Sequence, residues 1–422
     1  MQVYLVGGAV RDALLDIPVK DRDWVVVGAT PETLLALGCK QVGVDFPVFL
    51  HPETQEEYAL ARTERKSGRG YHGFEVNASP DVTLEEDLLR RDLTINAMAL
   101  SQTGELIDPY GGKLDLSARL LRHVSPAFTE DPLRVLRVAR FMAQLADFNF
   151  TLAEETRQLL RDMVVQGELA DLVPERVWLE VSKALMTSRP SLFFECLREV
   201  GALAELFPEL DKLFDVPQSP IHHPEGDAGT HTMMVVDAAA RISDNLDIRF
   251  AALVHDLGKG LTHSSFWPKH PGHEQSGLEL VNRWCQLYRV PKHTQQLALR
   301  ATEWHGVIHR GGLDMSPQEM LKVLRGCDAF RQPDRFEQLL MVCAADHHGR
   351  LGFEDKPYEQ MAFWIGALDA CNQVDAKALA ESGLTGEKMA QAMEQQRVAR
   401  LDNFKTHLIS LKKVQAGENL DG

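Results

Sequence analysis

Two aspartates near the start of the chain, Asp21 and Asp23, have the spacing of a metal-binding pair. They lie just before the apolar run 24–27. In a strand, residues i and i+2 point to the same face. Two carboxylates on one face can bind one or two Mg²⁺ ions, which phosphoryl transfer requires. In a chain with 61 acidic residues such a pair is common, and alone it is more often two solvated surface carboxylates.

A double glycine just upstream favours phosphate binding. Gly7 and Gly8 follow the apolar run 3–6 and precede a predicted helix that contains Arg11. Residues without a Cβ let backbone amides approach a phosphate, and a helix N-terminus favours negative charge. Because a double glycine between a strand and a helix is also ordinary turn chemistry, this interpretation depends on the other motifs.

Arginines in two predicted helices supply further candidates. The first helix begins with a capping box, Thr83 and Glu86, and is expected to run through Arg91 towards Met98. The second spans 130–141 and carries a polar residue every three positions, which gives one slowly drifting stripe. Arginines on a helix also commonly form a solvated face. The stripe consists of Asp131, Arg134, Arg137 and Arg140.

These segments together resemble the class II nucleotidyltransferases, the family of CCA-adding enzymes and bacterial poly(A) polymerases. The matching motifs are 7–12, 21–23, 91–98 and 130–134. The resemblance implies that they hold phosphates, bind catalytic Mg²⁺, contact the ribose and read the base, respectively. It assigns catalysis and metal binding to Asp21 and Asp23. The implied nucleotide-binding residues are Gly8, Arg11, Arg91, Asp131, Arg134, Arg137 and Arg140, of which Asp131 and Arg134 offer the acceptors and donors that pair with a base edge.

Histidines mark a second candidate site, because twelve of the sixteen fall between His222 and His348. The dipeptide His255-Asp256, followed by Leu-Gly-Lys-Gly, resembles the signature of the HD metal-dependent phosphohydrolases. The resemblance implies catalysis by His255 and Asp256 and a divalent metal, Mg²⁺ or a transition metal such as Ni²⁺. The implied metal ligands are His231, His255, Asp256 and Asp346.

The remaining histidines of this segment leave several roles open. His273 and His305 are candidates for groups that support the ligands, for substrate contacts, or for ligands of a second ion. Four others are expected to be surface imidazoles: His222, His223, His347 and His348.

The 422 residues suggest roughly three packed units. The pattern predicts an α+β fold in which a small mixed β-sheet head is followed by an all-α neck, an HD domain and a tail. The predicted boundaries are 1–140 for the nucleotidyltransferase head, 141–216 for the helical neck, 217–350 for the HD domain and 351–422 for the helical tail.

The net charge of −16 opposes non-specific nucleic-acid binding, so an RNA site requires a local basic patch. The segment 62–74 is a candidate: it is either a basic loop near RNA or a plain exposed loop. Six scattered cysteines fit reduced thiols, and no apolar run suffices for a membrane span, so we expect a cytoplasmic protein. An oligomer is possible. The basic and aromatic residues of the segment are Arg62, Arg65, Lys66, Arg69, Tyr71 and Phe74.

The order of head, helical connector and HD region resembles the bacterial multifunctional CCA proteins. This implies template-independent addition and repair of the 3′-terminal CCA of tRNA from CTP and ATP by two-metal nucleotidyl transfer. It also implies 2′,3′-cyclic phosphodiesterase, 2′-nucleotidase and phosphatase activities in the HD domain. Two alternatives remain, a poly(A) polymerase and an HD phosphohydrolase whose head only senses nucleotide.

Overall fold

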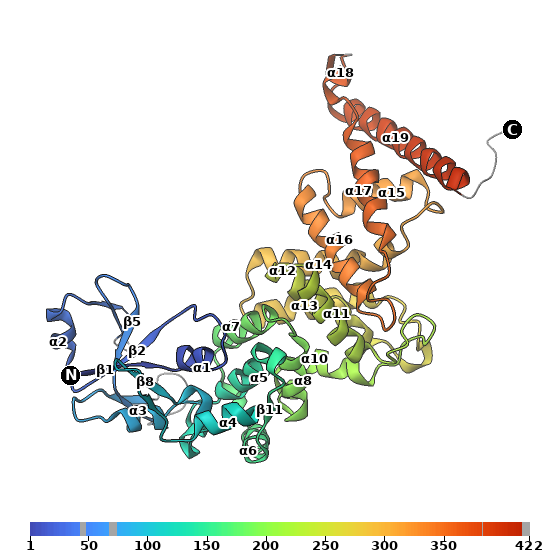
Figure 1. Ribbon diagram of the computed structural model, residues 1–422. Helices are drawn as coiled ribbons and strands as arrows, with labels where there is room; N and C mark the ends of the chain where they lie inside the picture. Colours follow the sequence, from blue (N-terminus) through green and yellow to red (C-terminus); the bar gives the residue numbers. More distant parts are fainter. Residues whose placement is uncertain (43–47, 67–73, 382, 416–422) are drawn as a thin grey trace. The chain divides into compact units, whose positions relative to one another are not determined.

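The computed structural model describes residues 1–42, 48–66, 74–381 and 383–415, and it shows two compact units (Figure 1). Unit 1 comprises Met1–Ala184 and Leu192–Leu206, and unit 2 comprises Leu185–Ser191 and Phe207–Gly422. The α+β class is confirmed, while the predicted four-part boundaries stay a prediction. Most side chains of the predicted basic loop lie outside the described residues: Arg65, Lys66, Arg69, Tyr71 and Phe74.

The head is built on a mixed sheet whose strand order is β3-β4-β5-β2-β1-β8-β9. Strand β1 pairs antiparallel with β2 and places Val6 opposite Asp23, while β5 runs parallel to β2. The strands are β1 (Gln2–Val6), β2 (Asp23–Val27), β3 (Lys40–Val42), β4 (Val48–Leu50), β5 (Glu57–Leu60), β8 (Ala99–Ser101) and β9 (Leu106–Ile107). A separate hairpin joins β6 (Thr63–Lys66) and β7 (Phe74–Asn77).

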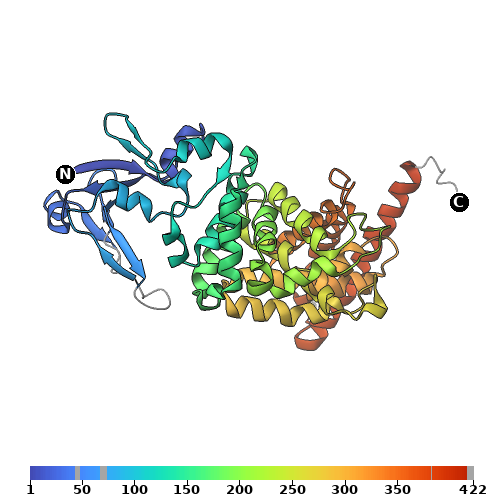
Figure 2. The ribbon, with the colours of Figure 1, turned by 90° about the horizontal axis from the view of Figure 1, so that it is seen from below.

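The sheet buries both faces because apolar residues occupy successive positions of its central strands. Val25 packs on one face with Leu88 of α3 (Leu84–Leu89), and Val26 packs on the other with Leu34 of α2 (Pro31–Ala36). In Figure 2 the strands (blue) lie at one end of unit 1 and its later helices (cyan to green) at the other.

Helix α3 is shorter than the sequence predicted. The capping box of Thr83 and Glu86 is present, but the helix ends at Leu89. The next residues form an isolated bridge at Leu93 and a short 3₁₀ turn, Thr94–Asn96. The buried Asp92 carboxylate accepts hydrogen bonds from the Leu93 amide and from Asn96, contacts that replace the continuing helix.

The helices that follow also begin and end differently from the prediction. The predicted helix over 130–141 is α5 (Arg134–Gln144), so Asp131 lies before it in extended conformation. The chain from 191 to 206 forms two helices rather than one, because Gly201 between them has a φ of +83°. The other helices of unit 1 are α1 (Gly8–Leu14), α4 (Gly112–Ala118), α6 (Glu154–Val165), α7 (Pro174–Leu185), α8 (Ser191–Glu199) and α9 (Ala202–Leu206), and a strand pair that was not predicted joins β10 (Leu120–Leu121) to β11 (Thr151–Leu152).

The regular elements of unit 2 are all helices in the part of the chain that the structure describes. Its central helix α12 (Leu246–Val254) is buried from Asp247 onward, because it packs on α11, α14 and α16. The other helices are α10 (Pro208–Asp211), α11 (Ala228–Ile242), α13 (His273–Leu287), α14 (Lys292–His309), α15 (Pro317–Gly326), α16 (Pro333–His348), α17 (Glu359–Asn372), α18 (Ala376–Glu381) and α19 (Gly386–Gln415). Helix α19 lies along α17 (Figure 1). Within the described ranges, no helix has both the length and the apolar character that a membrane span needs.

Candidate nucleotide and metal sites

A cleft of about 760 Å³ in unit 1 brings every predicted residue of the head together. Its walls come from the turn before α1, the start of β2, the segment after α3, helix α5 and helix α7. The predicted residues that line it are Gly8, Arg11, Asp21, Asp23, Arg91, Asp131, Arg134, Arg137 and Arg140. Residues separated by more than 100 positions in the sequence therefore share one cavity.

The two aspartates lie in the cleft, although not on one strand as predicted. Asp23 is the first residue of β2, and Asp21 lies in the irregular segment before it. Burial, and then the charge of Asp21, raise the pKa of Asp23 against the opposing charge of Arg91. Two neighbouring carboxylates repel each other and gain from a cation between them. The pair therefore suits a divalent metal.

The glycine turn brings a guanidinium close to the start of α1. Gly7 has a φ of +71°, and a Cβ there would lie 3.0 Å from Nη1 of Arg91. Arg11 lines the cleft although its residue is only 3% exposed. Its guanidinium donates to Asn96 Oδ1 and Asp12 Oδ1 at 2.8 Å each, and so joins α1 to the 3₁₀ turn at 94–96.

Asp87 is a residue that the sequence interpretation missed. Its carboxylate is fully buried and accepts hydrogen bonds from Arg90, from Arg91 and from the backbone amide of Arg62. Burial raises its pKa, but Arg90 and Arg91 outweigh burial and leave the pKa below the usual aspartate value. Asp87 thus fixes two arginines at the mouth of the cleft.

The arginines of α5 are oriented by buried acceptors. Arg137 donates to Asp92 Oδ2 at 2.7 Å, and Arg140 donates to Glu180 Oε2 of α7 at 2.6 Å. Arg134 donates to the backbone carbonyls of Ala127 and Arg90. Such partners hold guanidinium groups in one direction before a ligand arrives, which lowers the entropy cost of binding.

Asp131 has a partner that the sequence interpretation also missed, Arg176 of α7. Arg176 Nη2 donates to Asp131 Oδ2 at 3.0 Å, while Asp131 Oδ1 accepts from the Leu133 amide at 3.1 Å. Both carboxylate oxygens are therefore directed by the protein. No local motif marks Arg176, because its contact spans 45 positions.

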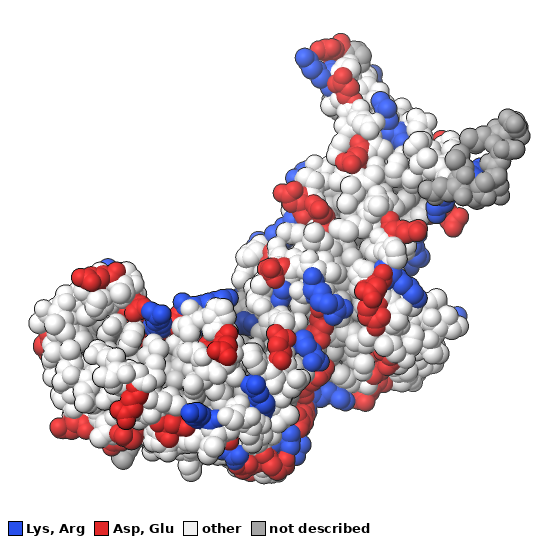
Figure 3. Space-filling view, in the orientation of Figure 1, with Lys and Arg blue, Asp and Glu red and all other residues white. Residues whose placement is uncertain are grey.

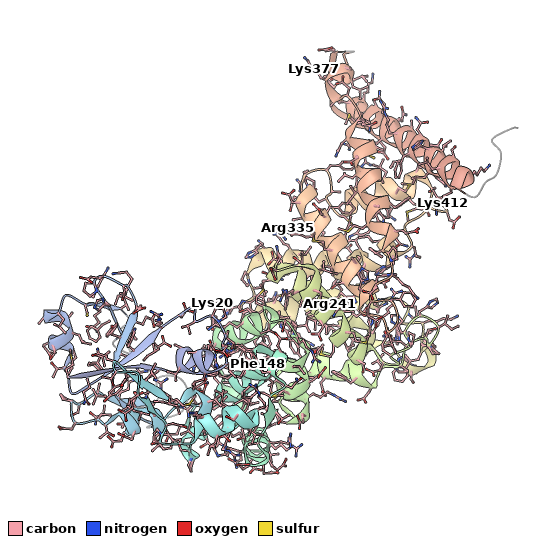
Figure 4. All side chains as sticks on the ribbon, viewed as in Figure 1. Lys20, Phe148, Arg241, Arg335, Lys377 and Lys412 are labelled. Atoms are coloured by element: carbon pink, nitrogen blue, oxygen red, sulfur yellow. The ribbon has the colours of Figure 1, made fainter. Side chains whose placement is uncertain are left out.

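The cleft is electropositive in an acidic chain. Nine of its lining residues are Lys or Arg and five are Asp, whereas the whole chain has a net charge of −16. Figure 3 shows basic side chains gathered along one edge of unit 1, next to the position of Lys20, which Figure 4 labels. This is the local patch that a polyanionic ligand requires.

The four predicted metal ligands converge in unit 2 from α11, α16 and the turn after α12. His255 ends α12 and Asp256 occupies the turn before the 3₁₀ segment Leu257–Leu261. His231 Nε2 lies 3.0 Å from Asp346 Oδ1, His255 Nε2 lies 3.1 Å from Asp256 Oδ2, and His255 Nε2 lies 3.9 Å from Asp346 Oδ2. All four residues are buried.

His273 and His305 join the same cluster. Their Nε2 atoms lie 3.3 and 3.4 Å from Asp256 Oδ1. The Nδ1 atoms of His255, His273 and His305 each face a backbone carbonyl at 2.8 to 2.9 Å. A proton on Nδ1 leaves the Nε2 lone pair directed at the carboxylates, which is the form that binds metal.

The cluster suits a metal ion for a second reason. Among the residues that the structure describes, the buried atoms His255 Nε2 and Asp256 Oδ1 have no hydrogen-bond partner. Buried polar atoms are rarely left in that state. Burial raises the pKa of Asp256, but His255 and Lys259 outweigh burial and hold it well below the usual aspartate value. The carboxylate is therefore ionised, as a ligand must be.

Several groups at this centre were missed or misplaced by the sequence interpretation. Lys259 Nζ lies 2.6 Å from Asp256 Oδ2, and His309 Nε2 lies 2.6 Å from Asp346 Oδ2. Tyr358 Oη lies 3.0 Å from the other ring nitrogen of His309. His223, predicted to be a surface imidazole, instead packs against His231 with ring centroids 4.6 Å apart. The i, i+4 spacing of His305 and His309 is the one signal that marked His309.

Models of known families match three successive parts of the chain. A poly A polymerase head domain matches residues 3–122, a probable RNA and SrmB-binding site of polymerase A matches 149–214, and an HD domain matches 228–346. The first match includes the cleft residues up to Arg91, and the third includes the four predicted metal ligands of the histidine cluster.

Solved structures of CCA-adding enzymes share the fold. An apo form is 20% identical with a TM-score of 0.64 and covers 97% of this chain and 92% of its own. The Bacillus stearothermophilus enzyme in complex with CTP is 22% identical with a TM-score of 0.62 and covers 99% of this chain and 95% of its own. At this identity the likeness concerns the fold alone.

Two curated relatives are far closer in sequence. The multifunctional CCA protein of Thioalkalivibrio sulfidiphilus is 57% identical over 96% of this chain and 99% of its own length. That of Hahella chejuensis is 52% identical over 100% of this chain and 99% of its own length. The resemblance seen in the motifs is thereby confirmed, and the chain belongs to the family of multifunctional CCA proteins.

Proposed function

We propose that this chain adds and repairs the 3′-terminal CCA of tRNA, using CTP and ATP, and that its HD domain hydrolyses phosphate esters. The observation that supports the proposal most is the meeting of nine predicted residues in one electropositive cleft. Close relatives with the same motifs are named multifunctional CCA proteins. Assignment of the individual residues is part of the proposal.

In the addition reaction the tRNA 3′ oxygen attacks the α-phosphorus of the bound nucleotide. A new P–O bond forms, the bond to the β-phosphate oxygen breaks, and pyrophosphate leaves. Asp21 and Asp23 would hold Mg²⁺, which lowers the pKa of the attacking hydroxyl and neutralises charge on the leaving group. Arg91, held beside Gly7 by Asp87, binds the phosphates of the nucleotide.

Selection of the base falls to the protein because no template strand is involved. Asp131 and Arg134 present acceptors and donors to the base edge. Arg176 fixes one oxygen of Asp131, and carbonyl acceptors fix Arg134. A rigid pair of this kind binds a base whose edge matches its donors and acceptors. A base that does not match leaves buried polar groups without hydrogen-bond partners.

In the HD domain, His231, His255, Asp256 and Asp346 would hold a divalent ion, Mg²⁺ or a transition metal such as Ni²⁺. The ion supplies a hydroxide nucleophile and a Lewis acid for phosphate ester hydrolysis. Lys259 and His309, which lie beside the two carboxylates, orient them. Opening of a 2′,3′-cyclic phosphate at its 3′ oxygen frees the tRNA 3′ hydroxyl that addition requires and leaves a 2′-phosphate. Hydrolysis of that 2′-phosphate then restores the 2′ hydroxyl and releases phosphate.

The experiment that tests this function supplies tRNA without its terminus with CTP, ATP or both. We expect two C residues from CTP alone and one further A when ATP is added. A poly(A) polymerase would instead add many A residues from ATP alone. An HD phosphohydrolase with a nucleotide-sensing head would add nothing while still hydrolysing a 2′,3′-cyclic phosphate. The cytoplasmic location and an oligomeric state stay predictions.

A further inference from the structure

Glu225 is a buried acid that none of the predicted motifs includes. It lies in the segment before α11, and its side chain is only 2% exposed. Its Oε1 accepts a hydrogen bond from His223 Nδ1 at 2.9 Å and lies 2.9 Å from His231 Nδ1. The contact to His231 is short but is not aligned as a regular hydrogen bond. A charged acid at this depth requires such partners.

The imidazole of His231 therefore lies between two carboxylates. Its Nδ1 faces Glu225 Oε1 and its Nε2 faces Asp346 Oδ1 at 3.0 Å. A carboxylate that attracts the Nδ1 proton leaves Nε2 unprotonated, directs it at the metal and makes it a stronger base. In His255 and His305 a backbone carbonyl occupies the corresponding place. In His273 a backbone carbonyl lies 2.8 Å from Nδ1, closer than the Glu274 carboxylate at 3.3 Å. His231 therefore differs from the other three in having a carboxylate as the group nearest to its Nδ1.

Glu225 also contacts the segment that follows α16, the helix that carries the predicted ligand Asp346. Its Oε2 accepts from the backbone amide of Leu351, just beyond α16, which carries Asp346. Helices α11 and α16 approach closely there, since a Cβ on Gly349 would lie 2.5 Å from Cγ2 of Val235. One carboxylate thus links His231 to the end of the helix that holds Asp346.

We propose that Glu225 is a positioning residue for the metal site of the HD domain, where it orients His231 and fixes the C-terminal end of α16. The inference rests on the proposed divalent metal at His231, His255, Asp256 and Asp346. It concerns the affinity of that site and the geometry of its ligands, and assigns Glu225 no contact with substrate.

The test measures Ni²⁺ binding to the full chain by isothermal titration calorimetry. Glu225→Gln keeps the size and an acceptor oxygen but removes the charge, and Glu225→Ala removes both. Loss of a carboxylate that supports a metal-bound histidine typically weakens affinity by about 10- to 100-fold. We expect about 10-fold weaker binding for Glu225→Gln and about 100-fold for Glu225→Ala, with KM for a 2′,3′-cyclic nucleotide unchanged and kcat reduced at fixed Ni²⁺.

Two controls separate failure of this inference from failure of the proposed metal site. Glu279→Gln changes an exposed acid on α13 and is expected to bind Ni²⁺ as the unaltered chain does. His255→Ala measures the Ni²⁺ that histidines outside the site bind. If both Glu225 variants bind Ni²⁺ within 2-fold of the unaltered chain, the positioning role is wrong while the site stands. If the unaltered chain binds no more Ni²⁺ than His255→Ala, the metal site itself is wrong, and this inference with it. Glu225→Gln decides the matter if Glu225→Ala fails to fold.

Discussion

In the cleft of unit 1 and in the histidine cluster of unit 2, hydrogen-bond partners behind the functional side chains orient them. The charge of the groups that face inward differs between the two sites. In the cleft, guanidinium groups face the cavity and carboxylates hold them from behind, as Asp92 holds Arg137 and Glu180 holds Arg140. In the cluster, imidazole Nε2 atoms face the carboxylates, and backbone carbonyls hold the rings from behind, as Ala252 holds His255.

The difference lies in what faces inward and how far it is buried. The cleft presents cations that remain partly exposed, such as Arg137 at 37%, around a volume that can admit a nucleotide. The four predicted ligands of the cluster present imidazole nitrogens and carboxylates that are 0 to 6% exposed. Their atoms belong to two groups that could each hold an ion, and both groups include His255. The first arrangement suits a polyanion and the second suits a small cation. Two chemistries can therefore coexist in one chain and be abolished separately.

The sharpest test of this separation is Asp23→Ala. Removal of one of two metal-binding carboxylates from the cleft is expected to lower CTP addition on the order of a thousandfold. Hydrolysis of a 2′,3′-cyclic nucleotide should be unchanged, because its ligands lie in the other unit. Asp162→Asn, an exposed aspartate of α6, serves as the control. Equal loss of both activities would mean that the two sites do not act independently.

His255→Ala is the mirror experiment. It removes a proposed ligand nitrogen that is buried and without a hydrogen-bond partner among the described residues, so we expect phosphoesterase activity to fall by at least about 100-fold. Addition of CMP to tRNA with a free 3′ hydroxyl should persist. The matched control is His407→Ala on the exposed face of α19. Loss of addition in His255→Ala, with the fold intact by circular dichroism, would contradict the division.

The motifs indicated residues that line each candidate site, but they did not indicate the groups that support those residues. Asp21, Arg91 and Asp131 were found because they stand in short motifs, and the structure places them in one cleft. Arg176 was missed because its partner lies 45 positions away. Glu225 was missed because a lone glutamate carries no spacing signal, and only the approach of α11 and α16 gives it a role.

Strands and helices were predicted correctly where the local sequence pattern determines their ends, and wrongly where a buried polar group determines them. The continuous apolar run 24–27 indicated the strand β2, and the capping box indicated the start of α3. Helix α3 stops early because Asp92 turns inward to meet Arg137, an interaction across 45 positions. Tertiary hydrogen bonds of this kind override helix propensity, and single-sequence patterns do not contain them.

The pair that ends α3 offers a test of the cleft by stability. Burial raises the pKa of Asp92, but Arg137 outweighs burial and leaves the pKa well below the usual value. A lowered pKa in the folded state adds stability that is complete above the unfolded pKa of about 4 and is lost as the pH falls towards the folded pKa. Because Arg137 is 37% exposed, solvent screens the pair, and we expect Asp92→Asn to cost only about 1 to 2 kcal/mol at pH 7.

Urea unfolding of the unaltered chain and of Asp92→Asn, at pH 7, 4 and 3, measures this contribution. The difference in unfolding free energy between the two should be constant from pH 7 to about 5 and should shrink between pH 4 and 3. A difference that does not depend on pH would mean that Asp92 contributes through its shape and hydrogen bonds to Leu93 and Asn96 rather than through its charge.

The smallest expected effect concerns selection between bases. Arg176→Gln removes the donor that fixes Asp131 Oδ2, while the Leu133 amide still holds Oδ1. The carboxylate keeps its place but gains freedom to rotate, so the ratio of kcat/KM for CTP to that for ATP, on tRNA awaiting its first C, should fall by about 3- to 10-fold, or roughly 1 kcal/mol. Lys113→Gln, an exposed cation of α4 in the same unit, should leave the ratio unchanged. If Arg176→Gln lowers kcat/KM for CTP and for ATP equally, Arg176 contributes charge to the cleft and does not orient Asp131. Base selection would then not depend on a supporting residue in the way that we expect for the ligands of the histidine cluster.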